Sequence, residues 1–178
     1  MSREFELIGA DVEWEGGIIA AGTERFRYSD GTEVTRDKVW HPGAVGIVAL
    51  DGEHVWLTRQ PREVVGATAS LEIPAGKLDV PGEPPIETAK RELSEEIGKR
   101  AERWEELLAF YTSPGISDER LWLYLATGLL DAPHAHADED ERIEIVPWPL
   151  VRLDDAISQC EDGKSLIALL WLAARRRA

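Results

Sequence analysis

The chain has 178 residues, of which 43% are hydrophobic, and a formal net charge of −14 at pH 7. This length and composition fit one globular domain, or one domain with an extension, and no apolar run is long enough to cross a bilayer. The negative charge argues against nucleic acid or an anionic membrane as a partner, because both require basic patches. Phosphate-bearing substrates would also be repelled unless metal ions offset the charge, so the balance fits a metal-using enzyme.

Two features of the sequence bear on the compartment. Residues 1–16 are charged and lack the basic-then-apolar pattern of a signal peptide. The single cysteine, Cys160, cannot form an internal disulfide, and we interpret it as a half-buried helix residue. These features predict a cytoplasmic protein.

The first segment, residues 1–40, is predicted to form a small antiparallel sheet, because turn signals separate stretches of rough polar and apolar alternation. The Ser-Asp-Gly sequence at 29–31 predicts the turn of a hairpin. Its two tryptophans, Trp14 and Trp40, either pack against neighbours or offer a flat surface for stacking on a base. Residues 1–40 are therefore treated as an N-terminal extension, and residues 41–178 as the main domain.

Apolar, β-branched runs predict the strands of the main domain, whereas VVGATAS at 64–70 is interpreted as a loop or an edge segment. Pro147 and Pro149 confine the end of the last strand to a sheet edge, because proline has no N–H to donate. One predicted helix is embedded among the strands and two follow them, which indicates an α+β domain with a mixed sheet and flanking helices. The predicted strands are 44–50, 54–60, 71–76, 104–115 (which ends in a loop), 121–130 and 143–150, and the closing helices are 153–160 and 165–177.

The stretch from Gly76 to Gly98 joins a glycine-containing loop to a predicted helix that begins near Pro84, since proline is favoured in a first turn. One face of this helix is apolar, and three carboxylates converge on another face. Three like charges on one face weaken a helix, unless the helix holds a cation or pairs its charges with i,i+4 partners. A hard divalent cation with oxygen ligands is the simplest candidate. The carboxylates are Glu92, Glu95 and Glu96.

This stretch resembles the signature of the Nudix hydrolases, which the segment RELSEEIG at 91–98 matches residue for residue. It departs from the family pattern in one extra residue between Gly76 and Glu83 and in Lys99, where an apolar residue is usual. The extra residue falls in a loop, where a change of length costs little. The resemblance implies the Nudix fold, a mixed β-sheet sandwiched between helices, here with the N-terminal antiparallel extension. It also implies Mg²⁺-assisted hydrolysis of a diphosphate, with Mn²⁺ as a possible substitute.

The resemblance further implies a role for each matching residue of the box. Glu92 and Glu96 would be the main metal ligands, assisted by Glu95, and the backbone carbonyl of Ala75 would be another oxygen ligand. Arg91 would orient the glutamates by ion pairing, so that Arg91 and Glu95 count as catalytic residues.

Residues outside the box resemble the ADP-ribose and ADP-sugar pyrophosphatases of the same family. The proline 16 positions after Gly98 looks like a mark of that group, and LEIPAGKLD at 71–79 is similar to its sequences. Residues 1–40 would correspond to a sheet exchanged between subunits, which implies a homodimer. The substrate-binding residues implied are Arg62, Glu72, Pro114, and Trp14 or Trp40 for stacking on adenine.

The acidic segment DAPHAHADEDE at 131–141 supplies candidates for a general base. By resemblance, Glu139 is the first choice for the base and Glu141 for an added metal ligand. Glu144 is less favoured because it alternates with isoleucines in a predicted strand. A solvated acidic loop remains the alternative interpretation of this segment. The nearby His134 and His136 either bind a transition metal or are exposed loop residues.

The sequence therefore predicts a Mg²⁺-dependent pyrophosphatase that hydrolyses ADP-ribose, or a related ADP-sugar, to AMP and a sugar phosphate. Two alternatives stay open. One is a Nudix hydrolase of another nucleoside diphosphate derivative, such as a nucleotide sugar or a dinucleotide. The other is a module that senses ADP-ribose without hydrolysing it, although such a module is expected to lose the box glutamates that this chain retains.

Overall fold

The computed structural model describes residues 4–133 and 142–177. The chain divides into two compact units. The N-terminal unit comprises Met1–Gly43 with Tyr111–Arg120, and the core unit comprises Ala44–Phe110 with Leu121–Ala178. No helix among the described residues is long and apolar enough to cross a membrane.

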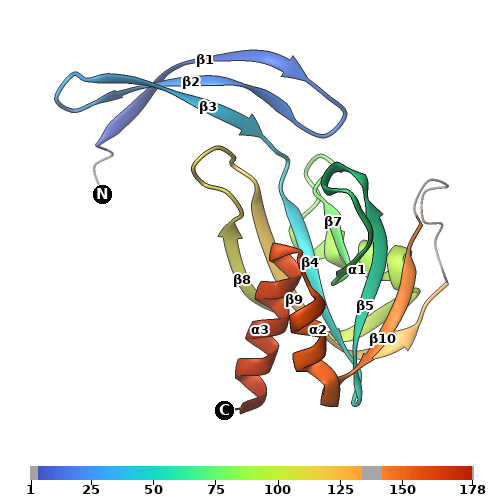
Figure 1. Ribbon diagram of the computed structural model, residues 1–178. Coiled ribbons are helices and arrows are strands. Elements are labelled where there is room, and N and C mark those ends of the chain that lie inside the picture. The colour runs from blue at the N-terminus through green and yellow to red at the C-terminus, as the bar shows by residue number, and fades with distance from the viewer. Residues whose placement is uncertain (1–3, 134–141, 178) are drawn as a thin grey trace. The chain divides into compact units, whose positions relative to one another are not determined.

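The N-terminal unit is built on three antiparallel strands in the order β1-β2-β3, shown in blue in Figure 1. The turn between β2 and β3 is the predicted one: Gly31 has a φ of 88°, and Asp30 Oδ1 accepts a hydrogen bond of 2.8 Å from the Thr32 N–H. A positive φ favours glycine, so the Ser-Asp-Gly signal located this hairpin correctly. The strands are β1 Phe5–Glu15, β2 Ala20–Tyr28 and β3 Glu33–Trp40.

The core unit is organised around a mixed sheet, in which the described strands follow the order β10-β5-β4-β9-β8. β4 and β9 are parallel, whereas β5 pairs antiparallel with β4, β6 and β10. β10 lies at an edge of this order, as Pro147 and Pro149 predict. The strands are β4 Ala44–Leu50, β5 His54–Arg62, β6 Ala67–Glu72, β7 Ala75–Lys77, β8 Lys99–Tyr111, β9 Arg120–Asp131 and β10 Glu144–Pro149.

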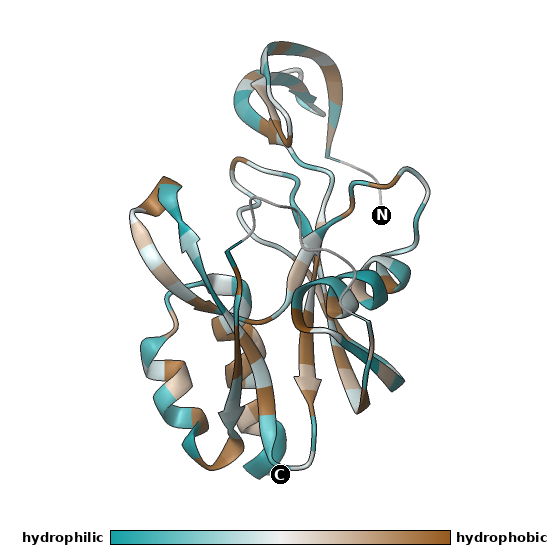
Figure 2. Ribbon diagram, turned by 90° about the vertical axis from the view of Figure 1, so that its right-hand side faces the viewer, coloured by the Kyte–Doolittle hydropathy of each residue, from teal (hydrophilic) through white to brown (hydrophobic). Residues whose placement is uncertain are grey.

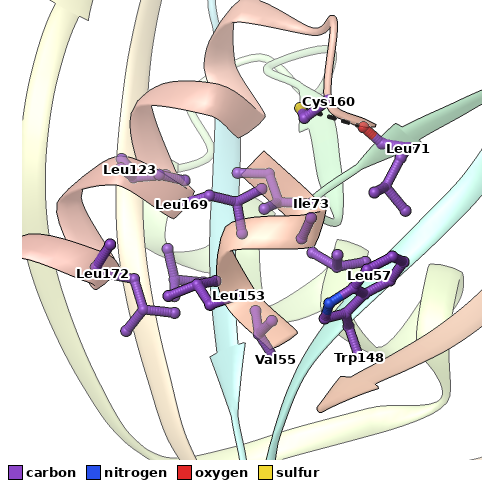
Figure 3. Close-up of a cluster of buried hydrophobic side chains, with 14 of the residues drawn as sticks. Val55, Leu57, Leu71, Ile73, Leu123, Trp148, Leu153, Cys160, Leu169 and Leu172 are labelled. Carbon is purple, nitrogen blue, oxygen red and sulfur yellow. Dashed lines mark hydrogen bonds between the residues drawn. The ribbon is translucent and has the colours of Figure 1, made fainter. Parts of the chain in front are cut away.

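Helices cover both faces of this sheet, with α1 on one side and α2 and α3 on the other (Figure 1). One buried cluster joins α1 to the sheet through Ala89, Leu93 and Ile97, and a second joins α2 and α3 to it through residues such as Leu153 and Leu169 (Figure 3). Hydrophobic residues run along the core strands in Figure 2, as expected for strands buried on two faces. The helices are α1 Pro85–Ile97, α2 Leu153–Gln159 and α3 Gly163–Arg177, with 3₁₀ turns at Glu63–Val65 and Leu150–Arg152.

Four details differ from the sequence-based expectations. The segment 71–76 is not one strand, because β6 ends at Glu72 and β7 begins at Ala75. Pro74 interrupts the pairing, and its carbonyl instead accepts a hydrogen bond of 2.8 Å from the Ile47 N–H. β8 begins at Lys99, five residues before the predicted start at 104. The segment 64–70, expected as a loop or an edge segment, contains a 3₁₀ turn and most of β6, which pairs with β5 outside the main strand order. Cys160 is buried and directly follows α2, rather than lying half-buried within a helix.

Candidate active site

The helix α1 is held in place at both of its ends. It begins with Pro85 in the first turn, where the missing N–H has no intrahelical partner to lose. It ends at Gly98, whose φ of 62° lies in the left-handed region and whose N–H bonds the carbonyls of Leu93 and Ser94. The buried apolar face of α1 fixes its rotation, so the carboxylates of the box point to a defined side of the helix.

The loop before α1 lies directly against two of these carboxylates. Glu96 is 6% exposed, and its Oε2 accepts a hydrogen bond of 3.0 Å from the Ala75 N–H. A side chain at Gly76 would collide with the carboxylate of Glu92, although the φ of Gly76 is not one that excludes other residues. Any larger residue here would displace the Glu92 side chain, so glycine allows the close approach of backbone to side chain. The backbone of Ala75 and Gly76 thus lies close to both Glu92 and Glu96.

Arg91 links the remaining carboxylates of the box. Its Nη1 lies 2.9 Å from Glu92 Oε1 and 2.8 Å from Glu95 Oε2. Its Nη2 lies 3.2 Å from Asp79 Oδ1 and 3.5 Å from Glu83 Oε2. Burial opposes the charge of Arg91, but the surrounding carboxylates outweigh burial and raise its pKa. Because four carboxylates surround one guanidinium, the cluster keeps a surplus of negative charge that attracts cations.

These groups fit a hard divalent cation by their chemistry, since all the candidate donors are carboxylate or backbone oxygens. In the described parts of the chain, no three His, Cys, Asp or Glu side chains are grouped as a metal site. In the box, Arg91 bridges Glu92 and Glu95, and the Nε of Arg91 is buried without a hydrogen-bond partner there. Binding of an ion would therefore require a rearrangement of these ion pairs.

A second charged cluster surrounds Glu72 at the end of β6. The side chain of Glu72 is 1% exposed, and its two oxygens each accept a hydrogen bond of 2.7 Å from Arg62, through Nε and Nη2. Lys164 Nζ lies 2.6 Å from Glu72 Oε2. Burial alone would raise the pKa of Glu72, but the hydrogen bonds from Arg62 and the charge of Lys164 outweigh it and lower the pKa from 4.5 to about 2. Glu72 is thus ionised at neutral pH.

The structure distributes the other expected site residues between the two units. Trp14, Trp40 and Pro114 belong to the N-terminal unit, where Trp14 is 56% exposed and Trp40 is partly buried. Arg62 and Glu72 belong to the core unit with the box. Glu144 is exposed at the start of β10. The expected base Glu139 and ligand Glu141 lie outside the described residues, as do His134 and His136.

Lys164 is a charged residue that the sequence did not single out. It follows Asp162-Gly163, which indicated only a break between two helices. Its partner Glu72 lies 92 residues earlier in the chain, so no local pattern joins the two.

Comparison with known proteins agrees with this geometry. Residues 40–170 of the sequence match the family model of the NUDIX domain. An ADP-ribose pyrophosphatase of Mycobacterium tuberculosis is 44% identical over 140 residues, covering 77% of this chain and 67% of that protein. A methanol dehydrogenase activator of Bacillus methanolicus is 35% identical, covering 97% and 95%. An ADP-ribose pyrophosphatase of Bacillus subtilis is 36% identical, covering 96% and 94%.

A solved structure confirms the predicted fold class. The crystal structure of an ADP compounds hydrolase superposes with a TM-score of 0.82 at 23% identity, covering 99% of this chain and 98% of that chain. At this identity the likeness establishes the shared fold alone.

The depressed pKa of Glu72 makes a prediction about stability against pH. A carboxylate whose folded-state pKa lies below its unfolded value stabilises the protein above the unfolded pKa, and this contribution is lost as pH falls through the folded pKa. Between pH 5 and pH 2, we expect wild type to lose about 3 kcal/mol more free energy of unfolding than Glu72→Gln does. Urea titrations across this range measure the difference.

The matched control is Glu87→Gln, which removes an exposed carboxylate paired with Lys90. That variant should follow the wild-type curve. Parallel curves for wild type and Glu72→Gln would contradict the low pKa.

Proposed function

The chain belongs to the Nudix family, and from that premise we propose that it is a Mg²⁺-dependent pyrophosphatase that acts on ADP-ribose or a related ADP-sugar and releases AMP and a sugar phosphate. The observation that carries the proposal is the close approach of the Ala75–Gly76 backbone to Glu92 and Glu96, which gathers oxygen donors on one side of α1. The substrate is supported by two relatives named ADP-ribose pyrophosphatase.

The residues of the box divide the work of hydrolysis. Glu92, Glu96 and the carbonyl of Ala75 would hold the divalent ion, with Glu95 assisting. A bound ion supplies neutralisation of phosphate oxygens and a water of lowered pKa. Arg91 would hold Glu92 and Glu95 in position through its ion pairs. Mn²⁺, which accepts the same oxygen ligands, would substitute for Mg²⁺.

Arg62, in the core unit, is the candidate for binding a substrate phosphate. Arg62 carries the charge and the planar donors suited to a phosphate group, and Glu72 holds its guanidinium. Trp14 or Trp40 would stack on the adenine, and Pro114 would shape the loop that follows β8. A cytoplasmic location, predicted from the sequence, is part of this proposal.

A second candidate is favoured by the relative from Bacillus methanolicus, which is named an activator of methanol dehydrogenase. In this case the chain would hydrolyse another nucleoside diphosphate derivative, such as a dinucleotide, or would regulate the activity of another enzyme. Retention of Glu92, Glu95 and Glu96 favours a hydrolytic role over a sensing module that binds ADP-ribose without cleaving it.

A substrate panel tests the proposed reaction. With Mg²⁺ or Mn²⁺, we expect ADP-ribose to give the highest kcat/KM among ADP-ribose, ADP-glucose, GDP-mannose, NADH and diadenosine polyphosphates, and EDTA to abolish turnover. Glu96→Gln should lower kcat on the order of 10³-fold, because it removes a charged oxygen donor from the site. The release of AMP is measured by chromatography.

The control for Glu96→Gln is Glu87→Gln, which alters an exposed carboxylate on the same helix. This variant should retain wild-type turnover. Full activity of Glu96→Gln would contradict the metal assignment, and binding of ADP-ribose without release of AMP by wild type would favour the sensing module.

The general base is proposed to be Glu139, with Glu141 as an added metal ligand. Substitution of a general base slows proton transfer while leaving the substrate contacts in place. We therefore expect Glu139→Gln to lower kcat by about 10²–10⁴-fold with little change in KM. Steady-state kinetics of Glu139→Gln, Glu141→Gln and Glu144→Gln rank the three, and a larger loss of kcat in either of the other two would reassign the base.

The N-terminal sheet is proposed to join two copies of the chain into a homodimer. Four of its apolar side chains are about half exposed: Phe5 at 47%, Leu7 at 54%, Val12 at 58% and Trp14 at 56%. All four lie on β1, and exposed apolar groups along one strand favour burial against a partner. Light scattering at micromolar concentration should give about twice the chain mass of 19.8 kDa. A monomer mass would overturn the dimer.

A further inference from the structure

Lys164 occupies an unfavourable place for a cation. It is the second residue of α3, close to the positive end of the helix dipole, where a positive charge is disfavoured. Its side chain is only 16% exposed, and its Nζ lies 2.6 Å from Glu72 Oε2 and 3.0 Å from Asp162 Oδ2. Helix stability does not account for a lysine here, whereas its contact with the buried Glu72 does.

The start of α3 is tied to the chain on both sides of Glu72. Asp162 Oδ2 accepts hydrogen bonds from the Ser165 N–H and Oγ–H. Ser165 Oγ in turn accepts a hydrogen bond of 2.9 Å from the Ile73 N–H. Cys160 Sγ donates to the Leu71 carbonyl at 3.4 Å, the dashed line in Figure 3. These hydrogen bonds fix the start of α3, and with it Lys164, relative to Glu72.

Glu72 holds Arg62 in a single orientation. Its two oxygens bond Nε and Nη2 of Arg62, which is the bidentate geometry of a planar guanidinium on a carboxylate. These bonds leave Nη1 of Arg62 without a partner among the described residues, and the Arg62 side chain is 45% exposed. The hydrogen bond that Arg62 donates to Glu72 and, more weakly, the charge of Glu96 raise the pKa of Arg62, so Arg62 lies within electrostatic reach of the box.

We propose that Lys164 is a positioning residue that sets Arg62 for recognition of the substrate diphosphate, through the carboxylate of Glu72. The inference rests on the proposed function, in which Arg62 contacts a substrate phosphate. Lys164 bonds the same oxygen that Arg62 Nη2 bonds, so it prevents the carboxylate from turning and fixes the direction of the guanidinium. It also offsets part of the charge of Glu72, so that more of the positive field of Arg62 reaches an anion. Because the Arg62 side chain is already ordered before substrate binds, binding the diphosphate loses less side-chain entropy.

The experiment compares Lys164→Met with Lys164→Arg, Arg62→Met and the Arg62→Met/Lys164→Met double variant. The matched control is Arg175→Met, which removes a cation from the exposed end of the same helix, where it pairs with Glu105. KM and kcat are measured for the diphosphate that wild type hydrolyses fastest. The dissociation constant of ADP-ribose is measured by calorimetry in the Glu96→Gln background, so that one readout does not depend on turnover.

Lys164→Met should raise KM and the dissociation constant about tenfold and leave kcat within about twofold. Lys164→Arg should restore most of the affinity, and Arg175→Met should match wild type. The double variant should bind no more weakly than Arg62→Met alone, because Lys164 acts only through Arg62.

Three outcomes would overturn the inference: an unchanged KM in Lys164→Met, a loss confined to kcat or to Tm, or additive effects in the double variant. An unchanged affinity in Arg62→Met would also overturn it, since no anion contact would remain to be positioned. Fastest turnover on a diphosphate other than ADP-ribose would refute only the proposed substrate.

Discussion

The approach of a glycine backbone to a buried carboxylate is the constraint on which the active site depends. Gly76 leaves no room for a side chain beside Glu92, and the neighbouring Ala75 N–H bonds Glu96. The loop and the helix can meet this closely only because the loop is anchored to the sheet, where β7 pairs with β4 and Pro74 accepts a bond from Ile47. The sheet thus fixes the position of the loop, and the loop and the helix together fix the positions of the oxygen donors.

Burial distinguishes the functional charges of α1 from ordinary helix ion pairs. Lys90 and Glu87 form an exposed pair of the kind that contributes little to stability. Glu96, by contrast, is 6% exposed, and the Glu92 side chain is 13% exposed. Carboxylates lose hydration when they are buried, so a chain gains nothing in stability from gathering several of them at one place. Their concentration around a single arginine is what the proposed divalent-cation site would require.

Local sequence signals predicted much of the fold, because the features that set the elements are themselves local. The apolar run 44–50 is β4, and Pro84 and Gly98 place the two ends of α1 within one residue. The division of 71–76 into two strands at Pro74 was missed, because the bond of its carbonyl to Ile47 across the sheet is a long-range contact. Glu72 was expected to contact substrate, but its partners in the structure are Arg62 and Lys164. Ion pairs between residues so far apart leave no periodic trace in the sequence.

The same long-range contacts connect α3 to the candidate site. α1 holds the loop 72–76 from one side through Glu96, and the start of α3 holds it from the other through Ser165 and Lys164. A lysine at the positive end of a helix opposes the stability of that helix, so its retention there needs a compensating gain. The buried carboxylate of Glu72 supplies that gain, and through it the C-terminal helix reaches the arginine that faces solvent beside the box.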